Sequence, residues 1–411
     1  MALLLLNRRP ILDRVPTWLP GASLIVVTER SAARSAPTGD FVRTEIVDDY
    51  TSPRVDRLID AVCATGRIER VLTTAESDVV RAARARERHG LPGQRTASAL
   101  AFRDKLRMRR LAARHGIAVP AAAVARDAGD VADFVRAHGL PVVVKPADGA
   151  GSVGVRVLRD RRAVRACVLP AGRTHLVERF VPGTVCHVDG LMSEGAVLHA
   201  VPSRYLHPNL ATATDGVPSV SGMLAPRDPL ARRLEEAASA VVAALPPVAG
   251  TTAFHAEFFH TPEDALVLCE IACRPGGCGI VEAHELATGV NLYAAQLRGQ
   301  AGLPVPGREP GLPRHGWAWF PPLPATLERL PESCSLPYAH RFAAHGETGV
   351  RHDGPRSSTD SIAELVFRLD DGGADGTRDG NRDGVGDGSE DVTERLREVE
   401  DWWSREVRWA A

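Results

Sequence analysis

Two lysines stand out in a chain that otherwise uses arginine for positive charge. Of its 50 lysine and arginine residues, only Lys105, in the run FRDKLRMRR, and Lys145, at the end of the apolar run PVVVKP, are lysines. An ammonium group is a compact point charge that fits between phosphate oxygens in a narrow site, whereas the planar fork of arginine is bulkier. We therefore regard both lysines as candidate phosphate ligands. The alternative is that two codons escaped an arginine bias by chance.

A glycine-rich segment begins three residues after Lys145 and predicts a mobile flap over a phosphate group. The chain reads Asp148-Gly149-Ala150-Gly151-Ser152-Val153-Gly154 and continues with the alternating VRVL of residues 155–158. Glycines let consecutive backbone N–H groups turn towards one anion without interference from Cβ atoms. The pattern therefore predicts a strand that ends in a lysine, a flap that covers a nucleotide, and a second strand.

Other nucleotide-binding motifs fit this segment less well. The G-x-G-x-x-G of residues 149–154 resembles a dinucleotide fingerprint, but that motif opens a helix, and residues 155–158 indicate a strand. The G-K-[ST] of a P-loop is absent from the sequence. In protein kinases the lysine follows the glycine loop, whereas here it precedes the loop.

Two glutamates about a hundred residues later predict a metal site. Residues 253–277 read AFHAEFFHTPEDALVLCEIACRPGG, in which two strand-like runs flank the turn signal TPED. A hairpin loop of two or four residues that pairs His260 with Ala265 places Glu257 and Glu270 on one face, displaced diagonally by one pair. Two carboxylates among apolar residues are costly unless a cation lies between them, and oxygen ligands favour Mg²⁺. The alternative is that both glutamates lie on a solvated face.

Three motifs together resemble those of the ATP-grasp carboxylate–amine ligases. They are PVVVKPADGAGSVGVRVL, LVERFVPG and HAEFFHTPEDALVLCEIACRPGG, and the similarity runs from the helix that carries Arg103-Asp104-Lys105 to about residue 300. The resemblance implies that Lys105 and Lys145 contact the phosphates of ATP and that the flap of residues 148–154 closes over them. It implies that the hinge beside the adenine consists of Glu178, Arg179, Phe180 and Val181.

The resemblance also implies the metal and catalytic residues. Glu257 and Glu270 would hold Mg²⁺, or Mn²⁺ in its place. Lys145 and Arg274 would be the catalytic residues. Lys145 would contact the phosphates of ATP, and Arg274 would steady the reacting phosphoryl group or acyl phosphate. Val185 stands where many members have a glutamate that binds the ribose, which leaves ribose recognition open. Ala272 stands where many have an asparagine that ligates a second metal, which leaves the number of metal ions open.

Length and pattern predict an α/β fold of two or three domains. In residues 1–98, apolar runs such as LIVVT at 24–28 alternate with helical stretches such as Val55–Thr65, which predicts a parallel α/β domain that starts with the strand MALLLL. The resemblance implies an ATP-grasp domain of α+β type at residues 99–301, with a lid at about 115–177 and a central antiparallel sheet. Residues 302–411 are expected to form a smaller C-terminal domain.

Three arginines after Lys105 are expected on a solvated helix face: Arg107, Arg109 and Arg110.

An acidic pattern in the C-terminal part matches the spacing of a calcium loop. Asp379, Asn381, Asp383, Gly384 and Glu390 follow the D-x-[DN]-x-[DN]-G-x5-E rule. The preceding DDGGADGTR is unable to form the entering helix of an EF-hand. We therefore expect a disordered Asp/Gly-rich segment at about 370–390, because it buries too little to offset its ordering entropy.

Composition excludes several classes of protein. The formal net charge of −1 argues against a nucleic-acid-binding surface. No run of eighteen apolar residues is present and the first apolar run is too short for a secretory signal, so we expect a soluble cytoplasmic protein that binds no membrane. The seven cysteines show no disulfide rhythm, and Cys269, Cys273 and Cys278 match no common zinc or iron–sulfur spacing.

The resemblance implies a ligase that activates a small carboxylate as an acyl phosphate, which an amine then captures with release of ADP and phosphate. Amino acids are the expected substrates, and a homodimer stays open. The stretch His207–Ser221 either gates the substrate, with Arg204 available for contact with a carboxylate, or is a surface loop without a chemical role. His255 either contacts the amine or packs in the core. Three alternatives remain: a biotin-dependent carboxylase, an acid–thiol ligase that uses coenzyme A, and a non-catalytic ATP-binding sensor, which the residues Val185 and Ala272 motivate.

Overall fold

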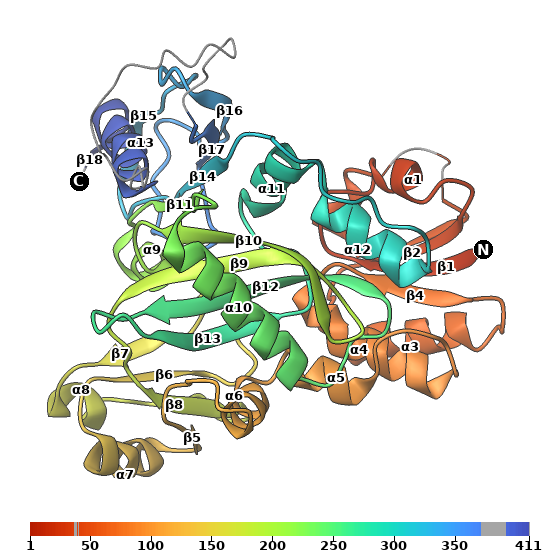
Figure 1. Cartoon of the computed structure of the whole chain (residues 1–411), viewed down its shortest axis with the longest axis horizontal. Helices are drawn as coiled ribbons and strands as arrows, with labels where there is room; N and C mark the ends of the chain where they lie inside the picture. Colours follow the sequence, from red (N-terminus) through yellow and green to blue (C-terminus); the bar gives the residue numbers. More distant parts are fainter. Residues whose placement is uncertain (37–38, 40, 371–391, 411) are drawn as a thin grey trace.

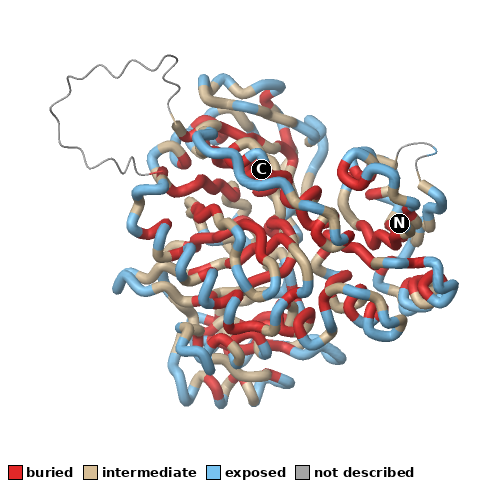
Figure 2. Tube along the Cα trace, turned by 45° about the vertical axis from the view of Figure 1, so that its right-hand side comes forward, coloured by how far each residue is buried: buried red, intermediate tan, exposed pale blue. Residues whose placement is uncertain are grey.

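A large antiparallel sheet occupies the centre of the molecule, between a parallel N-terminal sheet and a small sheet on the other side (Figure 1). This computed structural model describes residues 1–36, 39, 41–370 and 392–410. The arrangement confirms the predicted fold class, a mixed α/β protein with a parallel N-terminal domain and a central antiparallel sheet. Buried segments run through the strands of the central sheet and of the N-terminal sheet (Figure 2).

The N-terminal domain is a four-stranded parallel sheet in the order β3-β2-β1-β4. Its strands are β1 (Ala2–Asn7), β2 (Ser23–Glu29), β3 (Arg43–Val47) and β4 (Arg70–Thr73). The run MALLLL forms β1, as predicted, and helices cover both faces of this strand, so Leu3 and Leu5 pack on one face while Leu4 and Leu6 pack on the other. The helices are α1 (Val15–Trp18), α2 (Arg30–Ala33), α3 (Pro53–Cys63), α4 (Glu76–Arg88) and, from later in the chain, α12 (Leu292–Ala301).

A connecting helix pair leads into the small sheet. Its helices are α5 (Thr96–Ala101) and α6 (Lys105–Arg114). The side chain of Asp104 caps α6 by accepting hydrogen bonds from the amides of Leu106 and Arg107, which fixes Lys105 at the first helical position. The small sheet has the order β5-β8-β6-β7 and carries two helices on its outer face. Its elements are β5 (Ala122–Ala125), α7 (Ala128–His138), β6 (Val142–Pro146), β7 (Arg156–Leu158), α8 (Arg161–Arg165) and β8 (His175–Arg179).

The central sheet has eight strands in the order β13-β12-β9-β10-β11-β14-β17-β16. Five of its strands come from the middle of the chain: β9 (Thr184–Ser193), β10 (Ala196–Tyr205), β11 (Ser219–Met223), β12 (Thr251–His260) and β13 (Leu266–Ala272). The long helix α10 (Pro229–Ala244) lies across the strands β9, β10 and β13 (Figure 1). The remaining helices of this part are α9 (Asn209–Asp215) and α11 (Ile280–Thr288).

The C-terminal part extends the central sheet, because β14 pairs with β11. Its strands in this sheet are β14 (His315–Phe320), β16 (Ala339–Ala344) and β17 (Ala363–Arg368). The helix α13 (Val392–Glu406) covers the sheet, and its Trp403 stacks on Phe320 with ring centroids 4.0 Å apart. A separate ribbon joins β15 (Thr326–Arg329) to β18 (Arg408–Ala410). The calcium-loop pattern Asp379–Glu390 and the Asp/Gly-rich segment lie outside the described residues, apart from Asp370.

Candidate active site

The hairpin β12–β13 brings the two predicted metal ligands directly opposite each other. Glu257 pairs with Glu270 across the two strands, so both side chains leave the sheet on one face. The predicted register, with His260 opposite Ala265 and the glutamates displaced diagonally, is wrong. His260 pairs with Leu266 instead.

Two local features explain this register. The turn has three residues between Thr261 and Ala265, because Asp264 adopts a left-handed conformation with φ 60°, and this shifts the pairing by one residue. A bulge between Glu257 and Phe258 leaves Cys269 as an extra residue on β13 and shifts the pairing by one more. Each shift alone would turn one glutamate to the opposite face, and together they restore the common face.

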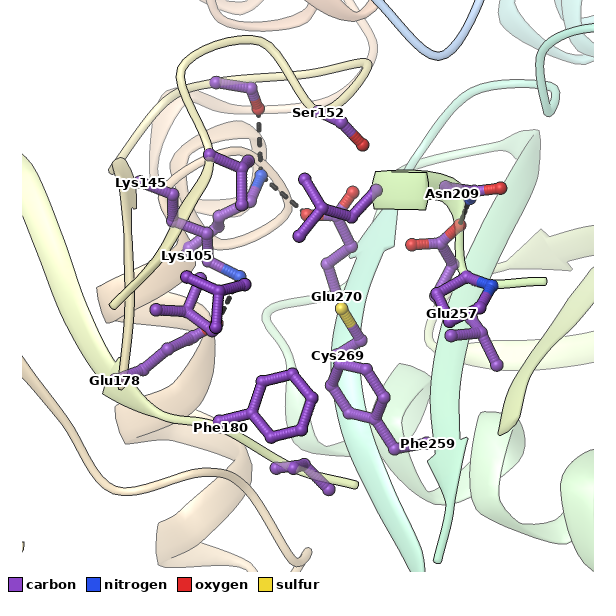
Figure 3. Close-up of a pocket in the computed structure, with 18 of the residues that line it drawn as sticks. Lys105, Lys145, Ser152, Glu178, Phe180, Asn209, Glu257, Phe259, Cys269 and Glu270 are labelled. Carbon is purple, nitrogen blue, oxygen red and sulfur yellow. Dashed lines mark hydrogen bonds and ion pairs between the residues drawn. The ribbon is translucent and has the colours of Figure 1, made fainter. Parts of the chain in front are cut away.

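A cavity lies between the small sheet and this hairpin, and both predicted lysines enter it (Figure 3). Lys105 Nζ lies 2.6 Å from Glu270 Oε2 and donates to the carbonyl of Gly149 over 2.9 Å. Lys145 Nζ lies 2.6 Å from Glu178 Oε1. Both lysine side chains are about nine-tenths buried, so the cavity holds two cations next to two carboxylates in a place of low solvent access.

Charge pairing keeps these buried groups ionised. Burial raises the pKa of Glu270, but the ammonium groups of Lys105 and Lys145 outweigh it and bring that pKa to about 2. Burial also lowers the pKa of Lys105, and the carboxylates of Glu270 and Glu76 reverse this effect and raise it above its ordinary value. A polyanion that enters the cavity therefore meets preformed positive charge.

Glu178 is a buried residue that pairs with two cationic side chains. Its side chain is buried between Lys145 and Arg109, whose Nη2 lies 2.5 Å from Glu178 Oε2. The pKa of Glu178 is lowered, since Lys145 and Arg109 overcome the effect of burial. The prediction of a solvated face for Arg109 is wrong, because this side chain is 3% exposed; Arg107 and Arg110 are exposed, as predicted.

The three residues after Glu178 line the cavity where the nucleotide base is expected. They are Arg179, Phe180 and Val181. The rings of Phe180 and Phe259 lie at the same end of the cavity, away from the lysine ammonium groups (Figure 3). Aromatic and apolar groups of this kind suit the faces of a planar base. Val185, which replaces the expected ribose-binding glutamate, also lines the cavity.

The predicted flap covers the other end of the cavity. Five of its residues line the wall: Gly149, Ala150, Gly151, Ser152 and Val153. Asp148 and Gly154 are not among the lining residues, and the carboxylate of Asp148 pairs instead with Arg173 at 3.1 Å. Arg103, next to the α6 cap, donates to the backbone carbonyls of Asp148 and Gly149, and thereby ties the base of the flap to the lysine helix.

A second cavity adjoins the first and shares both glutamates with it. Arg274 lines this second cavity, where its Nε and Nη2 donate to Glu76 Oε2 over 3.0 and 2.7 Å. Burial lowers the pKa of Arg274, but the Glu76 carboxylate reverses this and raises it further. Of the two sequence candidates for substrate contact, Asn209 in the stretch His207–Ser221 donates to Glu257 Oε1 over 2.9 Å. Arg204 lines neither cavity.

A chain of buried hydrogen bonds holds His255 at the edge of the second cavity. His255 Nδ1 lies 3.0 Å from one oxygen of Asp189, and His187 Nδ1 lies 2.6 Å from the other. His187 Nε2 lies 2.7 Å from the hydroxyl of Ser221. His187, Asp189 and His255 are residue types that can bind a metal ion. Both oxygens of Asp189 already pair with the two histidine rings, however, which indicates a network that positions His255. His255 Nε2 lies 3.5 Å from Glu257 Oε1, so the histidine both packs and borders the cavity.

The donor set at the junction of the two cavities fits a magnesium ion. Glu257 and Glu270 supply carboxylate oxygens from directly opposed residues, and the hard oxygen ligands that Mg²⁺ prefers are of this kind. Burial raises the pKa of the nearby Cys269 thiol to about 12, so this cysteine stays protonated and does not compete as a thiolate ligand.

Comparisons with known proteins agree with this geometry. A family model described as the ATP-grasp domain matches residues 102–277. The D-alanine–D-alanine ligase of Gloeobacter violaceus is 30% identical over 219 residues, which cover 49% of this chain and 68% of that protein. The chain belongs to the ATP-grasp family.

Two further relatives of this ATP-grasp protein are amino acid ligases by name. The L-arginine-specific L-amino acid ligase of Bacillus subtilis is 25% identical over 264 residues, which cover 61% of this chain and span 62% of that protein's length. The solved structure of an L-amino acid ligase from Bacillus licheniformis matches 100% of this chain and 99% of its own with a TM-score of 0.72 at 14% identity. The resemblance and the fold inferred from the sequence are therefore confirmed. Within the described residues, no helix of this ATP-grasp protein is long and apolar enough to cross a membrane.

Proposed function

We propose that this ATP-grasp protein is an ATP-dependent ligase that joins a small carboxylate to an amine through an acyl phosphate. The observation that carries the proposal is that Glu257 and Glu270 line both cavities. These two carboxylates would hold a metal ion, which would supply positive charge next to both cavities. Phosphoryl transfer needs this kind of positioning and charge neutralisation more than covalent help.

The residues of the first cavity suit MgATP, with Mn²⁺ as a substitute ion. Phe180 and Phe259 would flank the adenine, and Lys105 and Lys145 would neutralise the phosphates. The backbone N–H groups of the flap would add hydrogen bonds to the phosphates. Glu257 and Glu270 would hold the ion, which neutralises charge on the transferred phosphoryl group.

The residues of the second cavity suit the carboxylate and its acyl phosphate. An oxygen of the carboxylate attacks the γ-phosphorus, and the bond from that phosphorus to ADP breaks. Arg274 lines this cavity and pairs with Glu76, and Glu270 and Asp189 raise its pKa further; its guanidinium would hold the transferred phosphoryl oxygens. The amine nitrogen then attacks the acyl carbon, phosphate leaves, and the ammonium proton passes to solvent or to a nearby base.

The name of the Bacillus subtilis relative supports amino acids as substrates. We propose an amino acid or an amino-acid-like molecule on each side of the new amide bond. The test is a pooled screen in which the protein, MgATP and mixtures of amino acids and carboxylic acids are assayed for phosphate release, with mass spectrometry of the products. Separate reactions with bicarbonate plus biotin and with coenzyme A identify the two other ligase classes by their products, and binding of nucleotide with no phosphate release in any pool identifies a sensor.

Variants of one lysine and of the two shared glutamates test whether the activity depends on this site. Lys145→Ala, Glu257→Ala and Glu270→Ala are expected to lower ligation about 100-fold or more, since each removes charge stabilisation at the reacting phosphate. Glu263→Ala is the matched control, because Glu263 lies exposed in the turn of the same hairpin. Circular dichroism checks that each variant folds. Turnover near the normal rate in the folded Glu270→Ala protein would refute the metal assignment.

A further inference from the structure

A short C-terminal segment completes the wall of the second cavity. Ser358 and Thr359 line it together with Gly151 and Ser152 of the flap. The amide N–H of Ser358 donates to the carbonyl of Gly151 over 3.0 Å. We name the segment Arg356–Asp360 the latch. The flap, which belongs to the small sheet, is thus hydrogen-bonded to a segment about 200 residues further along the chain.

The latch keeps its shape through bonds that do not involve the flap. The carboxylate of Asp360 accepts hydrogen bonds from the amide of Arg356 over 2.7 Å and from the hydroxyl of Ser357 over 2.9 Å. Trp319 Nε1 on β14 donates to the carbonyl of Thr359 over 2.9 Å, which anchors the latch to the central sheet. Asp360 itself lines neither cavity. The latch is therefore a fixed part of the central unit.

The flap has the composition of a moving part. Gly151 and Ser152 adopt left-handed conformations with φ values of 61° and 58°. Neither residue belongs to a helix or a strand, so no regular backbone hydrogen bonding holds the flap where it meets the latch. Its two strands, β6 and β7, belong to the small sheet. A movement of that sheet away from the hairpin would withdraw Gly151 and Ser152 from the cavity wall and break the bond to Ser358.

We propose that the latch is the docking site of the closed flap, and that the two together close the second cavity around its substrate and exclude water from it. The proposal rests on the proposed ligase function. The cavity holds about 110 Å³, which is less than the 150 Å³ or so of an engineered cavity that takes up benzene. Its walls carry polar groups, among them Asn209 and His255. A substrate of the size and polarity of alanine or serine fits this space.

Closure has a chemical consequence. An acyl phosphate is open to hydrolysis, and a closed site protects it until the amine attacks. If the flap docks poorly, water consumes the intermediate, and phosphate is released without an amide product. The latch therefore sets both the efficiency of coupling and the size of the substrate that the second cavity admits.

A disulfide between flap and latch tests the docking directly. A Cβ atom built on Gly151 lies 3.8 Å from the Cβ of Ser357, which equals the mean separation of about 3.8 Å in disulfides. In the double variant Gly151→Cys/Ser357→Cys, oxidation is expected to form the crosslink and to lower multiple-turnover ligation at least about tenfold, since the flap must open between cycles. Dithiothreitol is expected to restore the rate of the reduced double variant.

The two single variants, treated with the same oxidant, are the controls for the native cysteines. Burial raises the pKa of Cys269, Cys273 and Cys278 to about 12, so these thiols react slowly. A folded, active double variant that fails to crosslink would overturn the docking geometry, and a crosslinked protein that turns over at the full reduced rate would overturn the requirement for opening. Absence of amide product from wild-type protein would count against the ligase function and not against the latch.

A second variant loosens the latch without touching either cavity. Asp360→Ala removes the two hydrogen bonds that shape the segment and is expected to raise the ratio of phosphate released to amide formed several-fold, with the KM for ATP within about twofold of wild type. Asp353→Ala is the matched control, because the Asp353 side chain is 84% exposed and pairs only at 3.4 Å with the exposed Arg356. Normal coupling in Asp360→Ala would refute the role of the latch.

The size limit has its own measurement. Thr359→Gly enlarges the second cavity and is expected to raise kcat/KM for a bulky amino acid relative to that for alanine. An unchanged ratio would show that Thr359 does not border the substrate in the second cavity.

Discussion

Arg109 is predicted to stabilise the protein through a carboxylate that also holds a phosphate-binding lysine. Its Nη2 lies 2.5 Å from Glu178, and the other oxygen of Glu178 lies 2.6 Å from Lys145. Replacement of Arg109 by Met removes the charge and keeps most of the volume. Glu178 then retains one buried cation in place of two.

The magnitude follows from two opposing effects. Removal of one partner of a buried ion pair costs about 3–5 kcal/mol in general, but Glu178 keeps its pair with Lys145, which places the loss at the low end. Nε and Nη1 of Arg109 are buried without a hydrogen-bond partner among the described residues, so methionine also removes an incompletely satisfied group. We expect Arg109→Met to lower the free energy of unfolding by about 2 kcal/mol.

The assay is urea unfolding combined with hydrogen exchange of the amides in α6 and β8, because exchange reports the stability of this part even when the whole chain does not unfold in one step. Arg110→Met is the control, since Arg110 is exposed on the same helix, and we expect it to change stability by less than about 0.5 kcal/mol. In a double-mutant cycle, Arg109→Met and Glu178→Gln are expected to show a coupling energy of about 1 kcal/mol or more. Equal stability of the Arg109 and Arg110 variants, or a coupling energy of zero, would refute the reasoning.

Other predictions address the lysine helix, the histidine network and the calcium pattern. Lys105→Arg places a bulkier group between Glu270 and the carbonyl of Gly149, and we expect kcat/KM for ATP to fall about 100-fold through misplacement of the flap; an unaffected value would contradict the need for a compact charge. Burial lowers the pKa of His255, but the pairing with Asp189 and Glu257 raises it to about 10, so its contribution to stability is fully present below its unfolded pKa of about 6.5 and is lost as the pH rises through 10. The stability difference between wild type and His255→Gln, measured by urea unfolding with a chelator present, should therefore shrink between pH 7 and pH 10, and a difference independent of pH would contradict this. Calorimetry is expected to show no calcium uptake below millimolar concentration; an uptake that Asp383→Ala abolishes would establish the calcium loop.

The parts of the site that depend on local sequence could be predicted. A strand that ends in lysine, a glycine-rich flap and a hairpin with two glutamates are each encoded within about twenty residues, and the structure brings these segments together. The register of the hairpin was predicted wrongly, because it depends on the left-handed conformation of Asp264 and on a bulge at Cys269. The amino-acid sequence does not strongly indicate either the conformation of Asp264 or the bulge.

The spacing between Lys105 and Arg109 indicated that Arg109 is buried, but the prediction of a solvated face did not use this spacing. Arg109 follows Lys105 by four residues, so both lie on one face of α6, and a helix that directs Lys105 into a cavity directs Arg109 the same way. Glu76 gave no such signal. It lies on the N-terminal domain, far along the chain from its partner Arg274, and only the packing of that domain on the central sheet brings the two together.

The C-terminal part shows the same limit of local reasoning. The proline-rich residues after 302 predicted a smaller C-terminal domain, but they did not indicate that its strand β14 pairs with β11 and extends the central sheet. The contribution of Ser358 and Thr359 to the second cavity follows from that pairing, which involves residues about a hundred apart. Sequence patterns describe strands well, but they do not say which distant strand becomes a neighbour.

The bulge in the β12–β13 hairpin constrains how this protein can change in length. The two glutamates are in phase because a three-residue turn and one extra residue at Cys269 offset each other. A regular ladder that retained Cys269 would pair this cysteine with Glu257 and turn Glu270 to the opposite face, whereas deletion of Cys269 would leave Glu257 opposite Glu270. Relatives that lack the extra residue should therefore also lack the bulge, since the two carboxylates then share one face without it.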